Sequence, residues 1–305
     1  MYEFFEPPVP LGEDGVPLEP ARLLHLPGEM NIDIYPPLIF VTLYREMLAE
    51  EVSSLSEVLE KRFPACPLYV QDRSVRPFTV VLERGEIPEE MTVKEGELEF
   101  FLHPKRGQNA GFFIDMRDGR RVIGEIVVEQ KAKGNGKVLN LFSYTCSLSV
   151  AALAAGAERV VNIDMNRKSL DVGKRNHRLN HGNIPGGYGT QALFLPHDIF
   201  KSLGKLRREG PYGLIIADPP PSQKGSFDLR KDYPRLLKRL PEMLAPGGEM
   251  LLSLNSPVAD WEDFERLVFD NLGPEWDVQR IAPPADFRPA EEGRGLKLLR
   301  VKQSL

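Results

Sequence analysis

The chain has 305 residues, of which 42% are hydrophobic and 27% are charged, a size and composition that suit two folded domains. No run approaches the roughly 18 apolar residues of a membrane span, and the amino terminus has no signal-peptide pattern. Two cysteines, Cys66 and Cys146, are too few and too far apart for a disulfide framework or a zinc cluster, so we expect a cytoplasmic protein without a metal site.

The net charge of −5 argues mildly against binding nucleic acid by bulk electrostatics. The charge is unevenly spread, however, because residues 1–96 hold 18 acidic and 8 basic residues, whereas residues 97–305 hold 26 acidic and 31 basic residues. Any surface for RNA should therefore lie in the later part of the chain, although each short basic cluster is by itself more typical of a solvated helix face.

Residues 1–30 are rich in proline and glutamate and show little periodicity, which predicts an extended or partly ordered leader. This leader could pack on the core or on a second copy of the chain, so a homodimer is one option. Residues 31–106 predict a small α+β domain. Its expected elements are strands over Leu38–Tyr44, Leu68–Gln71, Phe78–Leu82 and Leu98–Leu102, an acidic loop between the last two strands, and a helix over Arg45–Phe63.

Residues 107–305 predict a larger α/β domain that starts with an amphipathic helix over Met116–Gln130. The run from Val138 to Asp164 has the order of a buried strand, a tight loop, a helix of small residues, a second buried strand and an acidic residue. This order is typical of a doubly wound α/β sheet with a nucleoside site at the carboxyl ends of its strands.

The loop within this run, from Phe142 to Ser147, contains no glycine. A dinucleotide site needs glycines there, so that the backbone and a helix N-terminus can reach a pyrophosphate. The loop instead suits a nucleoside without phosphate, held by hydroxyls, backbone amides and an aromatic wall, and S-adenosylmethionine fits that description. Asp164 could accept both ribose hydroxyls. The other residues expected to hold the cofactor here are Asn140, Phe142, Ser143, Tyr144 and Thr145.

Another acidic residue, Asp198, follows a predicted helix over Lys168–Leu179 and a predicted strand over Ala192–Leu195. Its carboxylate could accept a hydrogen bond from the N6 amine of adenine. It could equally well cap the helix that begins near Ile199, because aspartate is a favoured N-cap residue.

The apolar run Leu214–Ala217 ends in Asp218-Pro219-Pro220. Two prolines directly after a strand end its pairing and leave carbonyl groups facing a cleft. In amine methyltransferases such a turn presents an acid and a carbonyl to the target amine. A helix over Tyr233–Leu244 and a strand over Glu249–Leu254 complete the pattern.

The family resemblance rests on the segments LNLFSYTCSLSVAALAAGA, VVNID, HDIF, IIADPP and APGGEMLLSLNS, with GFFIDMRDGR upstream. These are similar to the class I S-adenosylmethionine-dependent methyltransferases grouped with bacterial 23S rRNA large-subunit enzymes that methylate cytosine-5 or guanine. The resemblance covers roughly residues 31–305 and implies a Rossmann-like seven-stranded methyltransferase sheet, S-adenosylmethionine as cofactor and RNA as a partner. It also implies that the extra RNA-binding module of the PUA type is lacking, unless residues 1–30 are its remnant.

In this family the segment around GFFID closes over the cofactor, which implies cofactor contacts from Asn109, Gly111 and Phe113. Met165 and Ile199, each next to one of the acids, are expected beside the nucleoside, and Asp218 is expected to contact the cofactor as well as the target amine. The chain departs from the family pattern at three places: Asn109-Ala110 replaces a Lys-Thr pair, Cys146 replaces a glycine, and Ser222 replaces an aromatic residue on which a base could stack.

Methylation of pyrimidine carbon-5 requires a cysteine thiolate that first adds to the ring. Cytosine-methylating relatives carry this cysteine on the strand after Pro-Gly-Gly, where Asn255 stands here. We therefore expect N-methylation of a base in RNA, most simply rRNA, with Asp218 and the Pro219 carbonyl holding the amine and Asn255 reading the base edge. Two alternatives stay open: a methyltransferase of the same fold that acts on a small molecule or protein, and a non-catalytic S-adenosylmethionine-binding relative.

Overall fold

The computed structural model describes residues 3–106, 109–187, 189–220, 227–287 and 295–304. The chain forms two compact units, one of Met1–Ile114 with Pro284–Ala290 and the other of Asp115–Pro283 with Glu291–Leu305. The first unit extends beyond the boundary predicted near residue 106. It also includes a segment from near the carboxyl terminus, because the Arg22 backbone N–H donates to Asp286 Oδ2 at 2.9 Å.

The first unit contains a five-stranded sheet whose strands lie side by side in chain order. Only β3 and β4 pair in parallel, and helix α1 (Ala49–Arg62) makes the crossover between them. Val52, Leu55 and Leu59 of α1 pack into a core with the strand residues that face the helix. The strands are β1 (Ala21–Leu26), β2 (Met30–Tyr35), β3 (Leu38–Leu43), β4 (Leu68–Asp72) and β5 (Thr79–Arg84).

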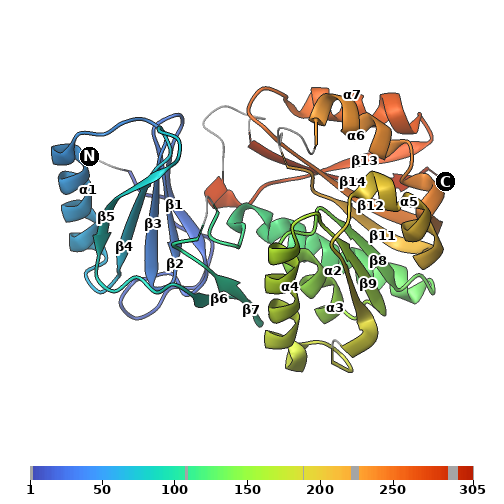
Figure 1. Ribbon diagram of the computed structural model, residues 1–305, viewed down its shortest axis with the longest axis horizontal. Helices are drawn as coiled ribbons and strands as arrows, with labels where there is room; N and C mark the ends of the chain where they lie inside the picture. Colours follow the sequence, from blue (N-terminus) through green and yellow to red (C-terminus); the bar gives the residue numbers. More distant parts are fainter. Residues whose placement is uncertain (1–2, 107–108, 188, 221–226, 288–294, 305) are drawn as a thin grey trace. The chain divides into compact units, whose positions relative to one another are not determined.

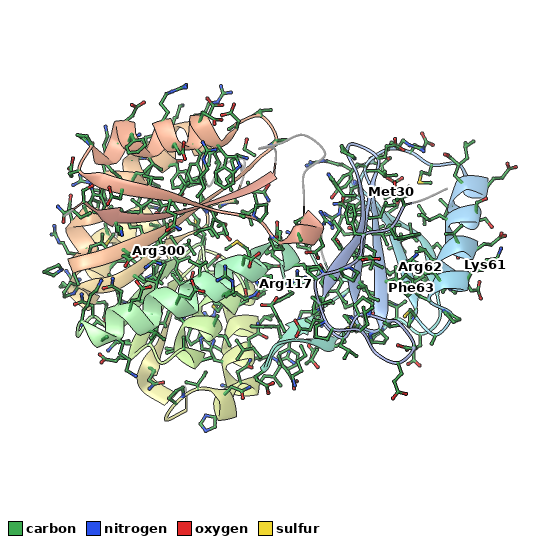
Figure 2. The ribbon with its side chains drawn as sticks, turned by 180° about the vertical axis from the view of Figure 1, so that it is seen from behind. Met30, Lys61, Arg62, Phe63, Arg117 and Arg300 are labelled. Atoms are coloured by element: carbon green, nitrogen blue, oxygen red, sulfur yellow. The ribbon has the colours of Figure 1, made fainter. Side chains whose placement is uncertain are left out.

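Three features of this unit differ from the prediction. The predicted leader over residues 1–30 contains strand β1, and the predicted acidic loop contains β6 (Met91–Glu95), which forms a hairpin with β7 (Leu98–Leu102). Both strands were missed because their polar residues hide the two-residue alternation. Helix α1 begins four residues later than predicted, where the Leu48 N–H donates to Glu51 Oε2 at 2.8 Å. Figure 2 shows Arg62 and Phe63 at its carboxyl end.

The second unit contains a seven-stranded sheet in the order β10-β9-β8-β11-β12-β14-β13. Of these seven strands, β14 alone runs opposite to the direction of the other six. The chain starts at β8, winds to one side and then returns to the other, so β8 and β11 flank the topological switch point. This confirms the predicted Rossmann-like, doubly wound fold. The strands are β8 (Lys137–Leu141), β9 (Arg159–Ile163), β10 (Ala192–Leu195), β11 (Tyr212–Ala217), β12 (Leu244–Ser256), β13 (Trp276–Ile281) and β14 (Gly295–Gln303).

Helices cover both faces of this sheet (Figure 1). Alternate strand residues such as Leu139 and Ile215 pack against one helical layer, and Val138 and Leu214 pack against the other. The strands therefore consist of nearly continuous apolar runs, as expected when both faces are buried. One layer contains α2 (Arg117–Ala132), α3 (Ser147–Ala154) and α4 (Arg167–Leu179), and the other contains α5 (Ile199–Glu209), α6 (Leu229–Leu237) and α7 (Trp261–Leu272).

Helix α6 begins and ends earlier than the predicted Tyr233–Leu244. The Asp228 side chain caps it by accepting hydrogen bonds from the backbone N–H groups of Arg230 and Lys231. None of the described helices is long and apolar enough to cross a membrane. Short 3₁₀ helices are η1 (Ile114–Met116), η2 (His181–Asn183), η3 (Gly189–Gln191), η4 (Pro241–Met243) and η5 (Ala285–Phe287).

Candidate active site

The carboxyl edge of the seven-stranded sheet gathers the predicted acidic residues. Strand register aligns Ile163, Leu141 and Ala217 across β9, β8 and β11. The residues that follow them, including Asp164 and Asp218, therefore emerge side by side at one edge. Asp198 comes three residues after Leu195, which pairs with Ile163, so it lies beyond the same edge. This is the edge at which doubly wound sheets bind ligands.

The loop after β8 is held in an uncommon backbone conformation. Phe142, Tyr144 and Cys146 have φ values of 56°, 44° and 63°, in the left-handed region that favours glycine. Each such residue costs roughly 1–2 kcal/mol and persists only where the surroundings fix it. Cys146, where the resemblance expects a glycine, thus occupies a left-handed position.

Helix α4 fixes this loop. Gly173 faces Cys146 so closely that a Cβ at Gly173 would overlap the Cys146 sulfur. Asn176 Nδ2 donates to the Thr145 carbonyl at 2.8 Å. His177 hydrogen-bonds Ser149 Oγ at 2.9 Å, and burial lowers its pKa to about 4, so the ring is neutral at pH 7. The loop is thus clamped by side chains that sequence reasoning did not select.

The spacing of Leu170, Gly173 and His177 on α4 was the available signal for this clamp. These residues recur at the three- and four-residue intervals of one helix face, and all three are buried together with Asn176. A buried asparagine on such a face needs a hydrogen-bond partner.

Both carboxylate oxygens of Asp164 accept backbone hydrogen bonds, one from the loop after β8 and one from the N-cap residue of α4. Oδ2 accepts from the Tyr144 N–H at 2.9 Å, and Oδ1 accepts from the Asn166 N–H at 2.7 Å. Burial raises the pKa of Asp164, and these two hydrogen bonds partly offset that shift. A carboxylate can accept about four hydrogen bonds, so capacity remains for the two hydroxyls of a ribose.

Asp218 is the second partly buried acid of the edge. Its pKa is raised to about 6, chiefly by burial and further by the charge of Asp115, while a hydrogen bond from Ser253 acts in the opposite direction. Ser253 lies there because Ala217 pairs with Leu252, one residue earlier on each strand. Ser253 was missed by the sequence reasoning, and its signal would have been this strand register. Asn255, two residues further, is exposed, and Pro219 is buried.

Two predicted cofactor residues take on structural roles. Asn140 Nδ2 donates to Asn162 Oδ1 at 3.0 Å, and both side chains are fully buried within the sheet. The Asn140 side chain therefore serves a cross-strand pair within the sheet, and a contact of Asn140 with the cofactor stays a prediction. Asp198 caps α5 by accepting from the Lys201 N–H at 3.1 Å. Its proposed contact with adenine stays a prediction, as does that of its buried neighbour Ile199.

The remaining predicted residues include three of the first unit. Asn109 is exposed, Gly111 has a φ of 110°, and Phe113 is 39% exposed. In the second unit Met165 is 58% exposed, next to Asp164. Contacts of these residues with a cofactor stay predictions, and Ser222 lies outside the described residues.

Neither cysteine is suited to act as a nucleophile. Cys146 is fully buried, and burial raises the pKa of its thiol. Burial also raises the pKa of Cys66, in the first unit. Thiolates are the reactive form of cysteine, so both side chains are inert near neutral pH. Among the described residues, no group of three or more His, Cys, Asp and Glu side chains is arranged to hold a metal ion.

Comparison with known proteins gives matches over nearly the whole chain. A family model described as S-adenosylmethionine-dependent methyltransferase matches residues 28–302. Ribosomal RNA large subunit methyltransferase I of Aeromonas salmonicida is 28% identical over 256 residues, which are 80% of this chain and 62% of that protein. The protein of the same name from Vibrio cholerae is 30% identical over 270 residues, 85% of this chain and 66% of that protein.

Solved structures agree on the fold. A methyltransferase from Streptococcus mutans aligns with a TM-score of 0.80 and 24% identity, covering 93% of this chain and 75% of that chain. A structure with the same values is complexed with SAH. The chain spans about 62% of the length of the first curated relatives it matches.

Proposed function

Because the chain belongs to the family of S-adenosylmethionine-dependent methyltransferases, we propose that it transfers the methyl group of S-adenosylmethionine to a nitrogen of a base in RNA. The family match confirms the predicted family and cofactor. The main support for a nitrogen as the methylated atom is the turn at Asp218 and Pro219. This turn follows β11 and lies next to the loop after β8.

The main task of the protein in methyl transfer is to align the nucleophile with the methyl group of the cofactor. When bound, the cofactor supplies an electrophilic methyl group, and in-line attack depends on holding nucleophile, carbon and sulfur in a row. The Asp218 carboxylate and the Pro219 carbonyl are suited to accept hydrogen bonds from an amine and so to aim its lone pair. Asp218, with a pKa of about 6, is ionised at neutral pH and can take the proton that the methylated nitrogen loses.

Carbon-5 of cytosine is disfavoured as the target. That reaction needs a thiolate on the substrate side of the site, and both cysteines are buried with raised thiol pKa values. Asn255, at the position where the resemblance expects a cysteine, is exposed at the end of β12 and is free to contact a base edge.

RNA as the substrate is supported by the names of the relatives, which are ribosomal RNA methyltransferases. It is also supported by the basic balance of residues 97–305. The cytoplasmic location and the homodimer stay predictions.

A tritiated-methyl transfer assay tests this function with total RNA, isolated ribosomal subunits and cell extract as acceptors. We expect label in RNA, and nuclease digestion should place it on a purine nitrogen. Label confined to protein or small molecules would favour the alternative methyltransferase. Absence of heat on calorimetric titration with S-adenosylmethionine would leave a binding-incompetent relative and end the proposal.

Two substitutions separate the roles of the acids. Asp164→Ala should weaken cofactor binding, whereas Asp218→Ala should mainly lower turnover at saturating cofactor. Calorimetry measures the first effect, and single-turnover methyl transfer measures the second. Equal effects of both substitutions on both quantities would contradict this division of roles.

A further inference from the structure

The helical layer formed by α5, α6 and α7 is sorted by charge. Helix α5 carries four basic residues and one acidic residue, and α6 carries three basic residues and one acidic residue. Helix α7, in the same layer, carries one basic residue and four acidic residues. A merely solvated layer mixes both signs, so this separation needs another explanation.

Helices α5 and α6 form one continuous surface although they are distant in sequence. The Arg235 guanidinium of α6 lies 4.5 Å from the centre of the Phe200 ring of α5. Arg207 of α5 lies 3.5 Å from Glu242, which follows α6 in the 3₁₀ helix η4. We call the exposed basic residues of this surface the basic face: Lys201, Arg207, Arg208, Arg230, Lys231, Arg235, Lys238 and Arg239.

Little of this positive charge is neutralised. Arg235 pairs with Asp232, and Arg239 pairs with Glu242, each at 2.9 Å. Both pairs are largely exposed, and exposed pairs contribute only about 0–1 kcal/mol, so an incoming anion can replace them. Within the described parts of the chain, the other members of the basic face, except Arg207, have no carboxylate at ion-pair distance. They are Lys201, Arg208, Arg230, Lys231 and Lys238.

The basic face begins at the catalytic edge. Helices α5 and α6 follow the parallel strands β10 and β11, so each starts at the carboxyl edge that carries Asp218. Lys201 and Arg230, in the first turns of these helices, are therefore at that edge. Helix α7 starts there too, but with Glu262 and Asp263. Within this helical layer, a polyanion with one base in the site would meet positive charge at the starts of α5 and α6 and negative charge at the start of α7.

We infer that the basic face binds the phosphate backbone of the RNA whose base is methylated. The inference deepens the proposed function, since it rests on RNA as substrate, but direct binding tests it separately. The chain has a net charge of −5, so it has no general attraction for polyanions. The sorted layer supplies this attraction locally, as phosphate recognition requires.

The test compares two variants of equal charge change, using a labelled 30-nucleotide single-stranded RNA of mixed sequence. Fluorescence anisotropy would follow binding between 50 and 200 mM KCl, and calorimetry with S-adenosylmethionine would show that each variant is folded. The first variant carries Arg208→Gln, Arg230→Gln, Lys231→Gln and Lys238→Gln. The control carries Arg121→Gln, Lys131→Gln, Arg266→Gln and Lys302→Gln, exposed residues outside the basic face.

We expect the first variant to bind about tenfold or more weakly than the wild type at 100 mM KCl. Its salt dependence should flatten by about 0.7 in log–log slope for each phosphate that the variant no longer binds. The control should stay within about threefold of the wild type, because it keeps every member of the basic face. Equal weakening in both variants, or a wild type that does not bind this RNA, would overturn the inference.

The two proposals fail separately. If the first variant and the control methylate RNA equally well, the proposed function is supported and the inference that the basic face binds RNA is contradicted. If only the first variant loses RNA binding but the wild type methylates no RNA, RNA binding by the basic face is supported and the proposed function is contradicted.

Discussion

The acidic side chains at the two edges of the seven-stranded sheet differ in whether a cation lies beside them. At the amino edge, Glu249 of β12 is buried and receives the Arg300 Nε–H at 2.6 Å and the Gln130 Nε2–H at 3.0 Å. Burial alone would raise the pKa of Glu249, but Arg300, assisted by Gln130 and Lys133, outweighs burial, so the net pKa is lowered. Figure 2 labels Arg300 on β14, where it also meets Glu129.

At the carboxyl edge, Asp164 and Asp218 have raised pKa values. No Lys, Arg or His of the described residues contributes to either shift. A cation beside a buried acid compensates the loss of hydration of its carboxylate, whereas an acid that is wholly or partly buried without a cation costs free energy unless a ligand uses it. At the amino edge the cation Arg300 compensates the acid Glu249. At the carboxyl edge the carboxylates of Asp164 and Asp218 have no cation partner in the described part of the chain and remain available for binding and chemistry.

The largest expected effect is on stability and comes from removing the Arg300–Glu249 ion pair at the amino edge. Arg300→Ala leaves Glu249 buried without its cation and should lower the free energy of unfolding by about 3 kcal/mol. Arg280→Ala is the matched control, because Arg280 pairs with Glu262 and Glu265 at the surface and should cost less than about 1 kcal/mol. Urea unfolding at pH 7.5 measures both.

The pH dependence sharpens this prediction. The lowered pKa of Glu249 contributes stability in the wild type that is present above its unfolded pKa and is lost as the pH falls through the folded value. Without Arg300 that contribution disappears, and protonation should relieve the buried charge. The difference between the wild type and Arg300→Ala should therefore shrink from pH 7.5 to pH 4, and a constant difference would contradict the assignment.

The next effect concerns the clamp on the loop at the carboxyl edge. Gly173→Ala would place a methyl group against Cys146 and should cost about 2 kcal/mol of stability through overpacking, together with weaker cofactor binding. Cys146→Gly in the same chain removes the clashing side chain and suits the left-handed backbone. The double variant should recover most of the loss in urea unfolding and in calorimetry. Additive losses would show that the two residues do not meet.

This clamp also shows what sequence can and cannot reveal. The strands, the glycine-free loop and the acids that close the strands follow from local patterns, and Asp164 and Asp218 indeed reach one edge. Gly173 and Ser253 were not predictable in that way, because their importance depends on neighbours distant in sequence. Asn140 lies in a predicted motif, yet its side chain faces a partner on β9.

A smaller effect should appear when the charge of Asp218 is removed. Its raised pKa means that stability is present at low pH and is lost as the pH rises through about 6. Asp218→Asn should therefore stabilise the ligand-free protein by about 1–2 kcal/mol at pH 7.5 and by much less at pH 4, while it lowers turnover. Urea unfolding at the two pH values checks the sign of the effect. Destabilisation at pH 7.5 would contradict the statement that the ionised Asp218 carboxylate lowers the stability of the ligand-free protein.

The smallest effect should come from Ser253, which donates a hydrogen bond to Asp218. This bond lowers the pKa of Asp218 against the effect of burial, so Ser253→Ala should move the acid limb of the pH profile for methyl transfer upward by up to about one pH unit. Cofactor affinity should stay unchanged, because the Ser253 hydrogen bond is made to Asp218 and not to Asp164. Ser253→Thr keeps the hydroxyl and should restore the wild-type profile. If the alanine and threonine variants share one profile, the Ser253 hydroxyl does not set the pKa of Asp218, and the prediction is wrong.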